Sequence, residues 1–224
     1  MTFSITARCA ETGQFGVAVA SSSPAVAARC AHARAHVGAV ATQNVTDPTL
    51  GPKALDLMAR GASAAEAVAI LLRTQPHMAY RQLAIVDVGG GTALHTGERT
   101  LGTHADAIET NVICAGNLLA NREVPTAMAA TFAATTGSLG DRLIAAMRTA
   151  LAAGGEEGPV HSAGLTIAHE APFPYAELRC DWRDDCPIEA LAALWQIYQP
   201  QADDYVTRAL SPDQAPSYGV PGDT

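Results

Sequence analysis

The order of strand-like and helix-like segments is the feature that most constrains how this chain can fold. Three strand patterns open the sequence, two helical patterns follow, and the rest alternates as three strands, two helices, two strands and a helix. Strands joined by short turns pair as antiparallel hairpins, whereas parallel pairs need a crossover helix between them. The order predicts an α+β fold with two mainly antiparallel sheets between helix pairs, a four-layer αββα sandwich. Because no linker or repeat interrupts it, we expect one domain over residues 1–224.

Local patterns set the expected boundaries of these elements. Ser63 and Glu66 form a capping box that begins one helix, and Gly89–Gly91 marks a hairpin turn, not a phosphate-binding loop. We expect strands over residues 2–7, 15–20, 37–43, 80–88, 92–96, 111–116, 162–168 and 176–182. We expect helices over residues 53–60, 63–74, 124–135, 138–153 and 187–198.

Composition excludes several classes of protein. A net charge of −8 on 224 residues argues against a nucleic-acid binder, which would present a basic face. The sequence has no apolar stretch of about 20 residues and no secretory leader pattern, so we expect a cytoplasmic protein. The cysteines are odd in number and lack C-x-x-C spacing, which predicts reduced thiols with no disulfide framework and no zinc site: Cys9, Cys30, Cys114, Cys180 and Cys186.

The strand pattern begins at the second residue, although chain ends usually fray. If the first hairpin turns at Thr12-Gly13, Ser23 lies opposite Thr2 and Ser21 lies opposite Ser4. Opposed residues share a face with Cβ atoms about 5 Å apart, so hydroxyls would gather at the N-terminus. A one-residue shift of the turn would place Ala25 opposite Thr2 instead, and Ser21–Ser23 could equally be a polar strand exit.

Thr2 can serve as a nucleophile if Met1 is removed. Excision of Met1 leaves Thr2 with a free α-amine beside its hydroxyl. The α-amine has an ordinary pKa near 7.7–8.0, so a useful fraction is neutral and can accept the proton of the hydroxyl. This is the N-terminal variant of nucleophilic catalysis. The pattern alone favours the simpler interpretation, that Thr2 is a strand residue.

Other polar residues are candidates for the same site. Asn117 follows a strand and a glycine, and its backbone N–H or side-chain amide could donate to an oxyanion; capping a turn is an equally good explanation. We expect Gln43 and Asn44 to contribute to substrate binding. Lys53 could lie near the nucleophile or be a solvated first-turn residue. Asp181 could bind a cationic group or belong to a helix cap.

No metal site is predicted. His32 and His36 have the i, i+4 spacing of a helical ligand pair, but no third ligand accompanies them, so a surface helix with two histidines is the better interpretation. A catalytic role could also be read into two adjacent pairs, His161-Ser162 and Glu156-Glu157. Adjacency in sequence says little about geometry, so neither pair is assigned a role. We expect no cofactor.

Nearly the whole chain resembles the N-terminal-nucleophile (Ntn) hydrolases, and within them a bacterial family catalogued as a domain of unknown function. The stretches that carry the resemblance are residues 2–5, 12–13, 16–19, 38–43, 50–52, 80–83, 116–117 and 215–223. The resemblance implies an Ntn-type sandwich with Thr2 as nucleophile. The family usually has Asp after the first strand, where this chain has Cys9, so Cys9 receives no catalytic role.

Two classes of function follow. The first is hydrolysis of a small-molecule amide or peptide-like C–N bond through an acyl-enzyme on Thr2, in a protein that we expect to be a homo-oligomer. The alternative is a non-catalytic binding or assembly protein that keeps the fold, because one fold hosts many functions. Hydrolysis by an internal nucleophile such as Ser4 or Ser22 is a third possibility.

Overall fold

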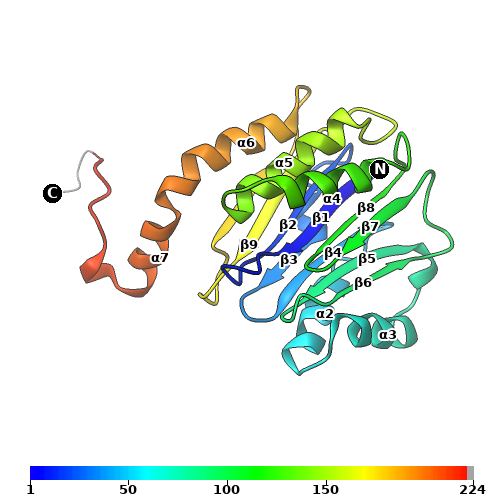
Figure 1. Cartoon of the computed structure of the whole chain (residues 1–224), viewed down its shortest axis with the longest axis horizontal. Helices are drawn as coiled ribbons and strands as arrows, with labels where there is room; N and C mark the ends of the chain where they lie inside the picture. The colour runs from blue at the N-terminus through cyan, green and yellow to red at the C-terminus, as the bar shows by residue number, and fades with distance from the viewer. Residues whose placement is uncertain (221–224) are drawn as a thin grey trace.

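The computed structural model describes residues 1–220, and its strands form two antiparallel sheets (Figure 1). The larger sheet has the order β10-β9-β2-β1-β8-β7: Ala176–Cys180, Ser162–Ala168, Phe15–Ser21, Thr2–Arg8, Val112–Asn117 and Ala105–Glu109. The smaller sheet has the order β3-β4-β5-β6: Ala31–Arg34, Gly38–Asn44, Arg81–Asp87 and Thr92–Thr96. The predicted α+β fold with two antiparallel sheets is confirmed, and β1 lies inside the larger sheet, between β2 and β8.

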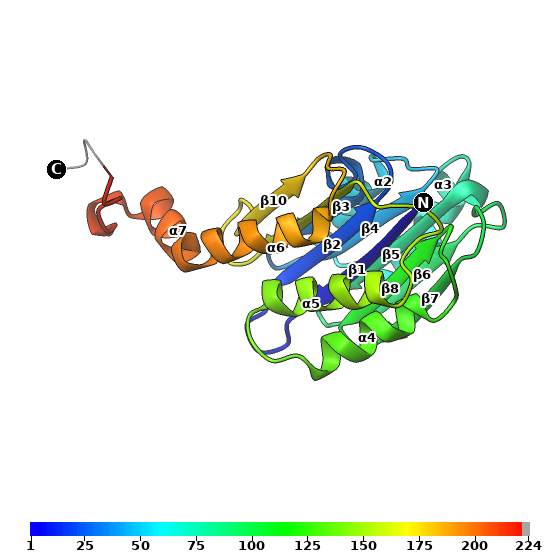
Figure 2. The same ribbon diagram turned by 90° about the horizontal axis from the view of Figure 1, so that it is seen from above.

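Helices pack on both sheets (Figures 1 and 2). Helices α4 (Val124–Ala134), α5 (Leu139–Ala152) and α6 (Pro187–Tyr198) share one apolar cluster with the larger sheet. Helices α2 (Leu50–Ala59) and α3 (Ala64–Thr74) share another with the smaller sheet. The remaining helical segments are α1 (Ala27–Cys30), α7 (Ala202–Leu210) and the 3₁₀ turns Met78–Tyr80, Gln199–Gln201 and Pro212–Gln214. Within residues 1–220, each helix is too short or too polar to span a bilayer.

The two faces of β1 have different chemistry because successive side chains of a strand point to opposite faces. Phe3, Ile5 and Ala7 pack into the apolar cluster under α4 and α5. Ser4 and Thr6 therefore point the other way, toward the smaller sheet. A third cluster joins the two sheets and is built mainly of small apolar side chains from β2, β4, β5 and β8: Phe15, Val17, Ala39, Ala41, Ala84, Val86 and Ile113.

The register of the first hairpin differs from the prediction. Phe3 pairs with Ala20, and the loop closes where the Cys9 N–H donates to the Gln14 carbonyl at 2.8 Å. The loop thus has four residues, 10–13, and Gly13 adopts the left-handed region with φ of +73°. As a result Ser21, and not Ser23, lies beside Thr2, and Ser4 pairs with Val19. Both predicted pairings were wrong by two residues, which leaves each side chain on its expected face.

Four of the labelled elements were not predicted: the strands β3 and β7 and the helices α1 and α7. Both strands lie at sheet edges, and every side chain of β3 is only half-buried, so neither shows a strong apolar alternation. The predicted helix carrying His32 and His36 is wrong, because His32 belongs to β3 and His36 to the turn that follows. His36 instead lies 3.3 Å from Glu170.

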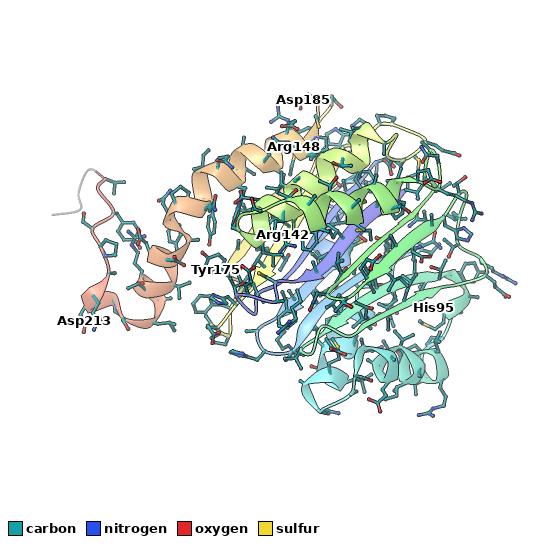
Figure 3. All side chains as sticks on the ribbon, viewed as in Figure 1. His95, Arg142, Arg148, Tyr175, Asp185 and Asp213 are labelled. Carbon is teal, nitrogen blue, oxygen red and sulfur yellow. The ribbon has the colours of Figure 1, made fainter. Side chains whose placement is uncertain are left out.

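Helices α5 and α6 are held together by polar contacts above their apolar faces. Arg148 of α5 (Figure 3) makes a bidentate pair with Glu189 of α6, at 2.8 Å from Nε to Oε1 and 2.6 Å from Nη2 to Oε2. The indole N–H of Trp195 donates to Asp141 at 2.9 Å, and the Trp195 ring lies directly on Gly140. A capping box begins α5 at Ser138. The predicted capping box at Ser63 is present and begins α3.

Gly140→Ala should destabilise the protein even though alanine is the better helix former by about 1 kcal/mol. A Cβ at this position would lie 2.3 Å from Cζ2 of Trp195, a fully buried ring. We expect a loss of about 1–3 kcal/mol in the free energy of unfolding from overpacking. Denaturant unfolding measures it, with Gly89→Ala as a control whose nearest neighbour is 3.4 Å away. A Gly140→Ala protein as stable as the native one would contradict this packing.

Candidate active site

Thr2 begins β1 between two neighbouring strands. It pairs directly with Asn117 of β8, and its Oγ1 lies 3.4 Å from Oγ of Ser21 on β2. Opposed residues of antiparallel strands have Cα atoms about 4.5–5.5 Å apart and share a face. Thr2 is 6% exposed and Asn117 is 1% exposed. The structure thus brings Asn117 to Thr2, as expected, and replaces Ser23 with Ser21 as the neighbouring hydroxyl.

The carbonyl group of Met1 lies at the centre of these hydroxyls. Both Thr2 Oγ1 and Ser21 Oγ donate to the Met1 carbonyl oxygen. Ser21 Oγ in turn accepts a 3.0 Å hydrogen bond from the backbone N–H of Ser23. The side chain of Met1 extends toward Gly158. An acyl carbonyl can therefore be held next to the Thr2 hydroxyl by a second hydroxyl.

A buried layer of amide side chains lies behind Thr2. Gln82 of β5 accepts through Oε1 from Nε2 of Gln43 at 2.8 Å and from Nδ2 of Asn117 at 3.3 Å. Its own Nε2 donates to the Gly116 carbonyl and to Thr96, each at 3.3 Å. Gln43, Gln82 and Asn117 are each 1% exposed. This network links the two sheets and fixes the amide of Asn117.

Several buried polar atoms of this region have no hydrogen-bond partner among the described residues. They are the hydroxyls of Ser4 and Thr6, the side-chain oxygens of Gln43 and Asn117, and both carboxylate oxygens of Glu156. A buried unpaired polar group costs about 1–3 kcal/mol. So many in one region indicate a site selected for something other than stability. Ser4, proposed as an internal nucleophile, is fully buried, whereas Ser22 is half-buried.

A cavity of about 250 Å³ opens beside Thr2. The loop after β2 forms one wall, and strained backbone shapes it, since Ala25 has a φ of +51°. Asn44, at φ of +73°, closes the other side, with its side chain bonded to the Tyr80 carbonyl and the Leu101 N–H. The cavity is lined by Met1, Thr2, Ser21, Ser23, Val26, Arg29, Cys30, Asn44, Thr46 and Pro48.

Glu156 is the residue that sequence reasoning missed. It is 5% exposed, and burial raises the pKa of its carboxyl to about 7, although the N-terminal amine, Ser22 and His161 act to lower it. Ser22 reaches the carboxyl without making a well-formed hydrogen bond. The segment is fixed where the Glu157 N–H donates to the Leu118 carbonyl at 3.0 Å. A buried carboxyl with a strongly raised pKa is a candidate for a functional site.

Two predicted residues lie elsewhere. Lys53 is exposed on α2 and donates to Gln75 at 2.6 Å, so it does not line the cavity. The carboxylate of Asp181 pairs with Arg179 at 2.8 Å, and only its backbone carbonyl reaches the cavity loop, where it accepts from the Ala25 N–H. Both assignments to substrate binding are therefore corrected, because each side chain has a partner away from Thr2.

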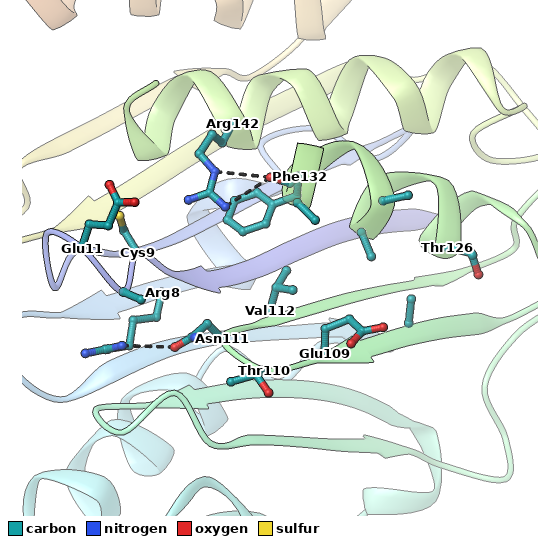
Figure 4. Close-up of a pocket in the computed structure, with 15 residues that line it drawn as sticks. Arg8, Cys9, Glu11, Glu109, Thr110, Asn111, Val112, Thr126, Phe132 and Arg142 are labelled. Carbon is teal, nitrogen blue, oxygen red and sulfur yellow. Dashed lines mark hydrogen bonds between the residues drawn. The ribbon is translucent and has the colours of Figure 1, made fainter. Parts of the chain in front are cut away.

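A larger cavity, of about 540 Å³, lies at the opposite end of β1 (Figure 4). The guanidinium of Arg142 stacks on the Phe132 ring at 4.0 Å and donates to the Phe132 carbonyl. The pKa of the nearby Cys9 thiol is lowered. Burial acts to raise this pKa, but hydrogen bonds from Thr12 and Glu11, together with the charge of Arg142, outweigh the effect of burial. None of the predicted site residues lines this cavity. Nowhere in residues 1–220 do three potential metal ligands gather.

Comparison with known proteins places the chain in a family. The model of a family of unknown function, DUF1028, matches residues 2–191, beginning at Thr2 itself. This chain belongs to the DUF1028 family. The crystal structure of a DUF1028 protein, SPO2555 from Silicibacter pomeroyi, superimposes with a TM-score of 0.82 at 31% identity, covering 88% of this chain and 89% of that one.

A second solved structure is a more distant match to the chain. Anbu (ancestral beta-subunit) from Yersinia bercovieri is 12% identical, with a TM-score of 0.40 over 91% of this chain and 97% of that one. A likeness at that level carries no argument about the site. Among curated proteins, none matches the sequence.

Glu156→Gln should stabilise the protein at high pH but not at low pH. Burial raises the pKa of the carboxyl from 4.5 to about 7, so the folded state holds a proton that the unfolded state releases between these values. Native stability therefore falls as the pH rises from 4.5 to 7, and above pH 7 the neutral glutamine should be better by up to about 3 kcal/mol.

Denaturant unfolding across pH 4–9 measures the difference between the Gln variant and the native protein. The exposed neighbour Glu157, changed to Gln, is the matched control and should give a far smaller difference. If the benefit of Glu156→Gln were independent of pH, the carboxyl would not be buried as described.

Proposed function

We propose that the protein hydrolyses small amide or peptide-like C–N bonds, with Thr2 as an N-terminal nucleophile exposed by removal of Met1. The observation that carries the proposal is the contact of two hydroxyls, Thr2 Oγ1 and Ser21 Oγ, with one carbonyl group at the mouth of a cavity. We further propose that the two sheets and their outer helices form the four-layer αββα sandwich of the Ntn hydrolases. The central position of β1, which begins at a hydroxyl residue, supports that assignment.

The reaction would proceed in two steps. The neutral α-amine of Thr2 accepts the hydroxyl proton while Oγ1 attacks the substrate carbonyl carbon, which gives a tetrahedral oxyanion. The C–N bond breaks, the leaving nitrogen takes the proton from the ammonium, and an ester on Thr2 remains. Water, deprotonated by the same amine, then attacks the ester and releases the acid and free Thr2.

Ser21 is the better-placed oxyanion donor. Its hydroxyl already donates to the carbonyl oxygen in front of Thr2, whereas the amide nitrogen of Asn117 donates to Gln82. Asn117 would then act through the position of β8, or through its backbone N–H. Glu156, close enough for the N-terminal charge to lower its pKa, would receive or return a proton of the amine.

The alternative is a protein that retains the fold without the chemistry. Retention of Met1 in the mature protein would favour it, since a peptide bond at Thr2 removes the basic amine. Intact mass measures this before any substrate is known.

Thr2→Ala should abolish turnover and leave the fold intact, because the hydroxyl is lost and nothing in the apolar core changes. Thr2→Ser should keep part of the activity, since amine and hydroxyl remain. The rate should rise with pH through the pKa of the α-amine, near 7.7–8.0 unless its surroundings shift it. Thr12→Ala, at the far end of the same hairpin, is the control. Normal turnover by Thr2→Ala, or by protein that keeps Met1, would place the nucleophile elsewhere.

Ser21→Ala should lower kcat by about 10²–10³ if its hydroxyl stabilises the oxyanion. Asn117→Ala should instead lower stability by about 0.5–1.5 kcal/mol, because the buried Gln82 oxygen loses one of its two donors and keeps the one from Gln43. Single-turnover rates and thermal unfolding of both variants separate the two effects. A large drop in rate for Asn117→Ala alone, at native stability, would restore Asn117 as the donor.

A further inference from the structure

We propose that the substrates carry a carboxylate and that Arg29 binds it. This inference rests on the proposed hydrolase function and names the class of amide on which the Thr2 site acts. Arg29 follows the loop after β2 and, among residues 1–220, contributes the only charged side chain to the lining of the 250 Å³ cavity. The other lining groups are hydroxyls, an amide, a thiol and apolar side chains.

The guanidinium of Arg29 is anchored on one side and open on the other. Its Nη1 donates to the Pro24 carbonyl at 2.8 Å and to the Ala25 carbonyl at 3.2 Å. Across residues 1–220, no carboxylate lies within ion-pair distance of it, and Nε and Nη2 make no hydrogen bond. An arginine fork with one edge fixed and other donors open suits a planar carboxylate.

The loop that precedes α1 and Arg29 is fixed before any ligand binds. The Ala25 N–H donates to the Asp181 carbonyl at 2.9 Å, and the Val26 N–H donates to Ser162 at 3.2 Å. Ser162 also donates to the Ser23 carbonyl at 2.6 Å. The strained φ of Ala25, +51°, persists within this network and turns its carbonyl to Arg29. Little side-chain entropy remains to be lost on binding.

The charged groups that act on the cavity wall are cationic. Burial raises the pKa of the Cys30 thiol in the cavity wall, while Arg29 and the chain's amine both act to lower it, so two cations reach this wall. Nearby acids are engaged elsewhere: Asp47 accepts from the N–H and the hydroxyl of Thr49, and Asp181 pairs with Arg179. A cavity with two cations and no lining acid concentrates anions.

The cavity has the size of a small-molecule site. With Met1 in its lining it holds about 250 Å³, just below the range of roughly 300–1,000 Å³ common for ligand pockets, and removal of Met1 adds the space of that residue. It suits an amide of amino-acid size, with the scissile carbonyl at the Thr2 and Ser21 hydroxyls and the carboxylate at Arg29. A cationic amide does not fit this charge.

The test measures binding without turnover, in the Thr2→Ala protein after Met1 removal. The probes are N-acetylglycine and its uncharged carboxamide, titrated by calorimetry or NMR. We expect the carboxylate to bind at least about tenfold more tightly, and more weakly as salt is added. The preference should vanish in Arg29→Met and should be partly kept in Arg29→Lys. Arg73→Met is the control: Arg73 is an exposed residue of α3, so the preference should be unchanged.

Equal binding of the two probes, no binding of the carboxylate, or a preference that survives Arg29→Met would overturn the proposal. If Arg29→Met loosens its loop, seen as a lower melting temperature, Arg29→Lys and the salt dependence decide the outcome. Turnover by protein with native Thr2 is scored separately. Carboxylate preference without hydrolysis would refute the hydrolase and leave the anion site standing, whereas equal hydrolysis of both probes would refute the anion site alone.

Discussion

The pairing of β1 with a strand on each side is the constraint on which the site depends. A strand end that is bonded on both edges cannot fray, so residue 2 has a fixed position although it lies next to the chain terminus. Phe3 and Ile5, both fully buried under the helices, hold the same strand in the core. The hydroxyl of Thr2 is thereby placed by packing and by two ladders of backbone hydrogen bonds, and Ser21 and Asn117 arrive beside it through those ladders.

The interface between the two sheets changes from apolar to polar side chains along the strands. Toward the middle of the strands the two sheets meet through small apolar side chains such as Ala39, Ala41 and Val17, which shows that this chain can pack the interface without polar groups. At the Thr2 end, hydroxyls and amides replace them, and several have no partner within residues 1–220. Each such group lowers stability. The proposed site, which would receive a polar ligand, accounts for their concentration around one hydroxyl.

The sequence predicted what local pattern controls and missed what depends on the path of the chain in space. The strand over residues 162–168 and the helix over 187–198 were predicted to the residue, because alternation, proline and flanking turns define them. The hairpin register failed because Cys9 and Gln14 close a longer loop than Thr12-Gly13 suggests. Glu156 was seen only as part of an acidic pair, since its burial follows from how residues 154–158 lie against Leu118 and Leu119.

Charge links the parts of this site. In the proposed hydrolase, removal of Met1 places the chain's amine on Thr2, which lines the same cavity as Arg29, and the amine of the intact chain already acts on the buried Glu156. The carboxyl of Glu156 stays neutral up to a pH of about 7 because it is buried. An anionic substrate, bound by Arg29 as we propose, would neutralise the cation that lines the cavity. Arg29 would then bind the charge of the substrate while Thr2, which lines the same cavity, attacks its carbonyl, so that binding and chemistry would use different groups.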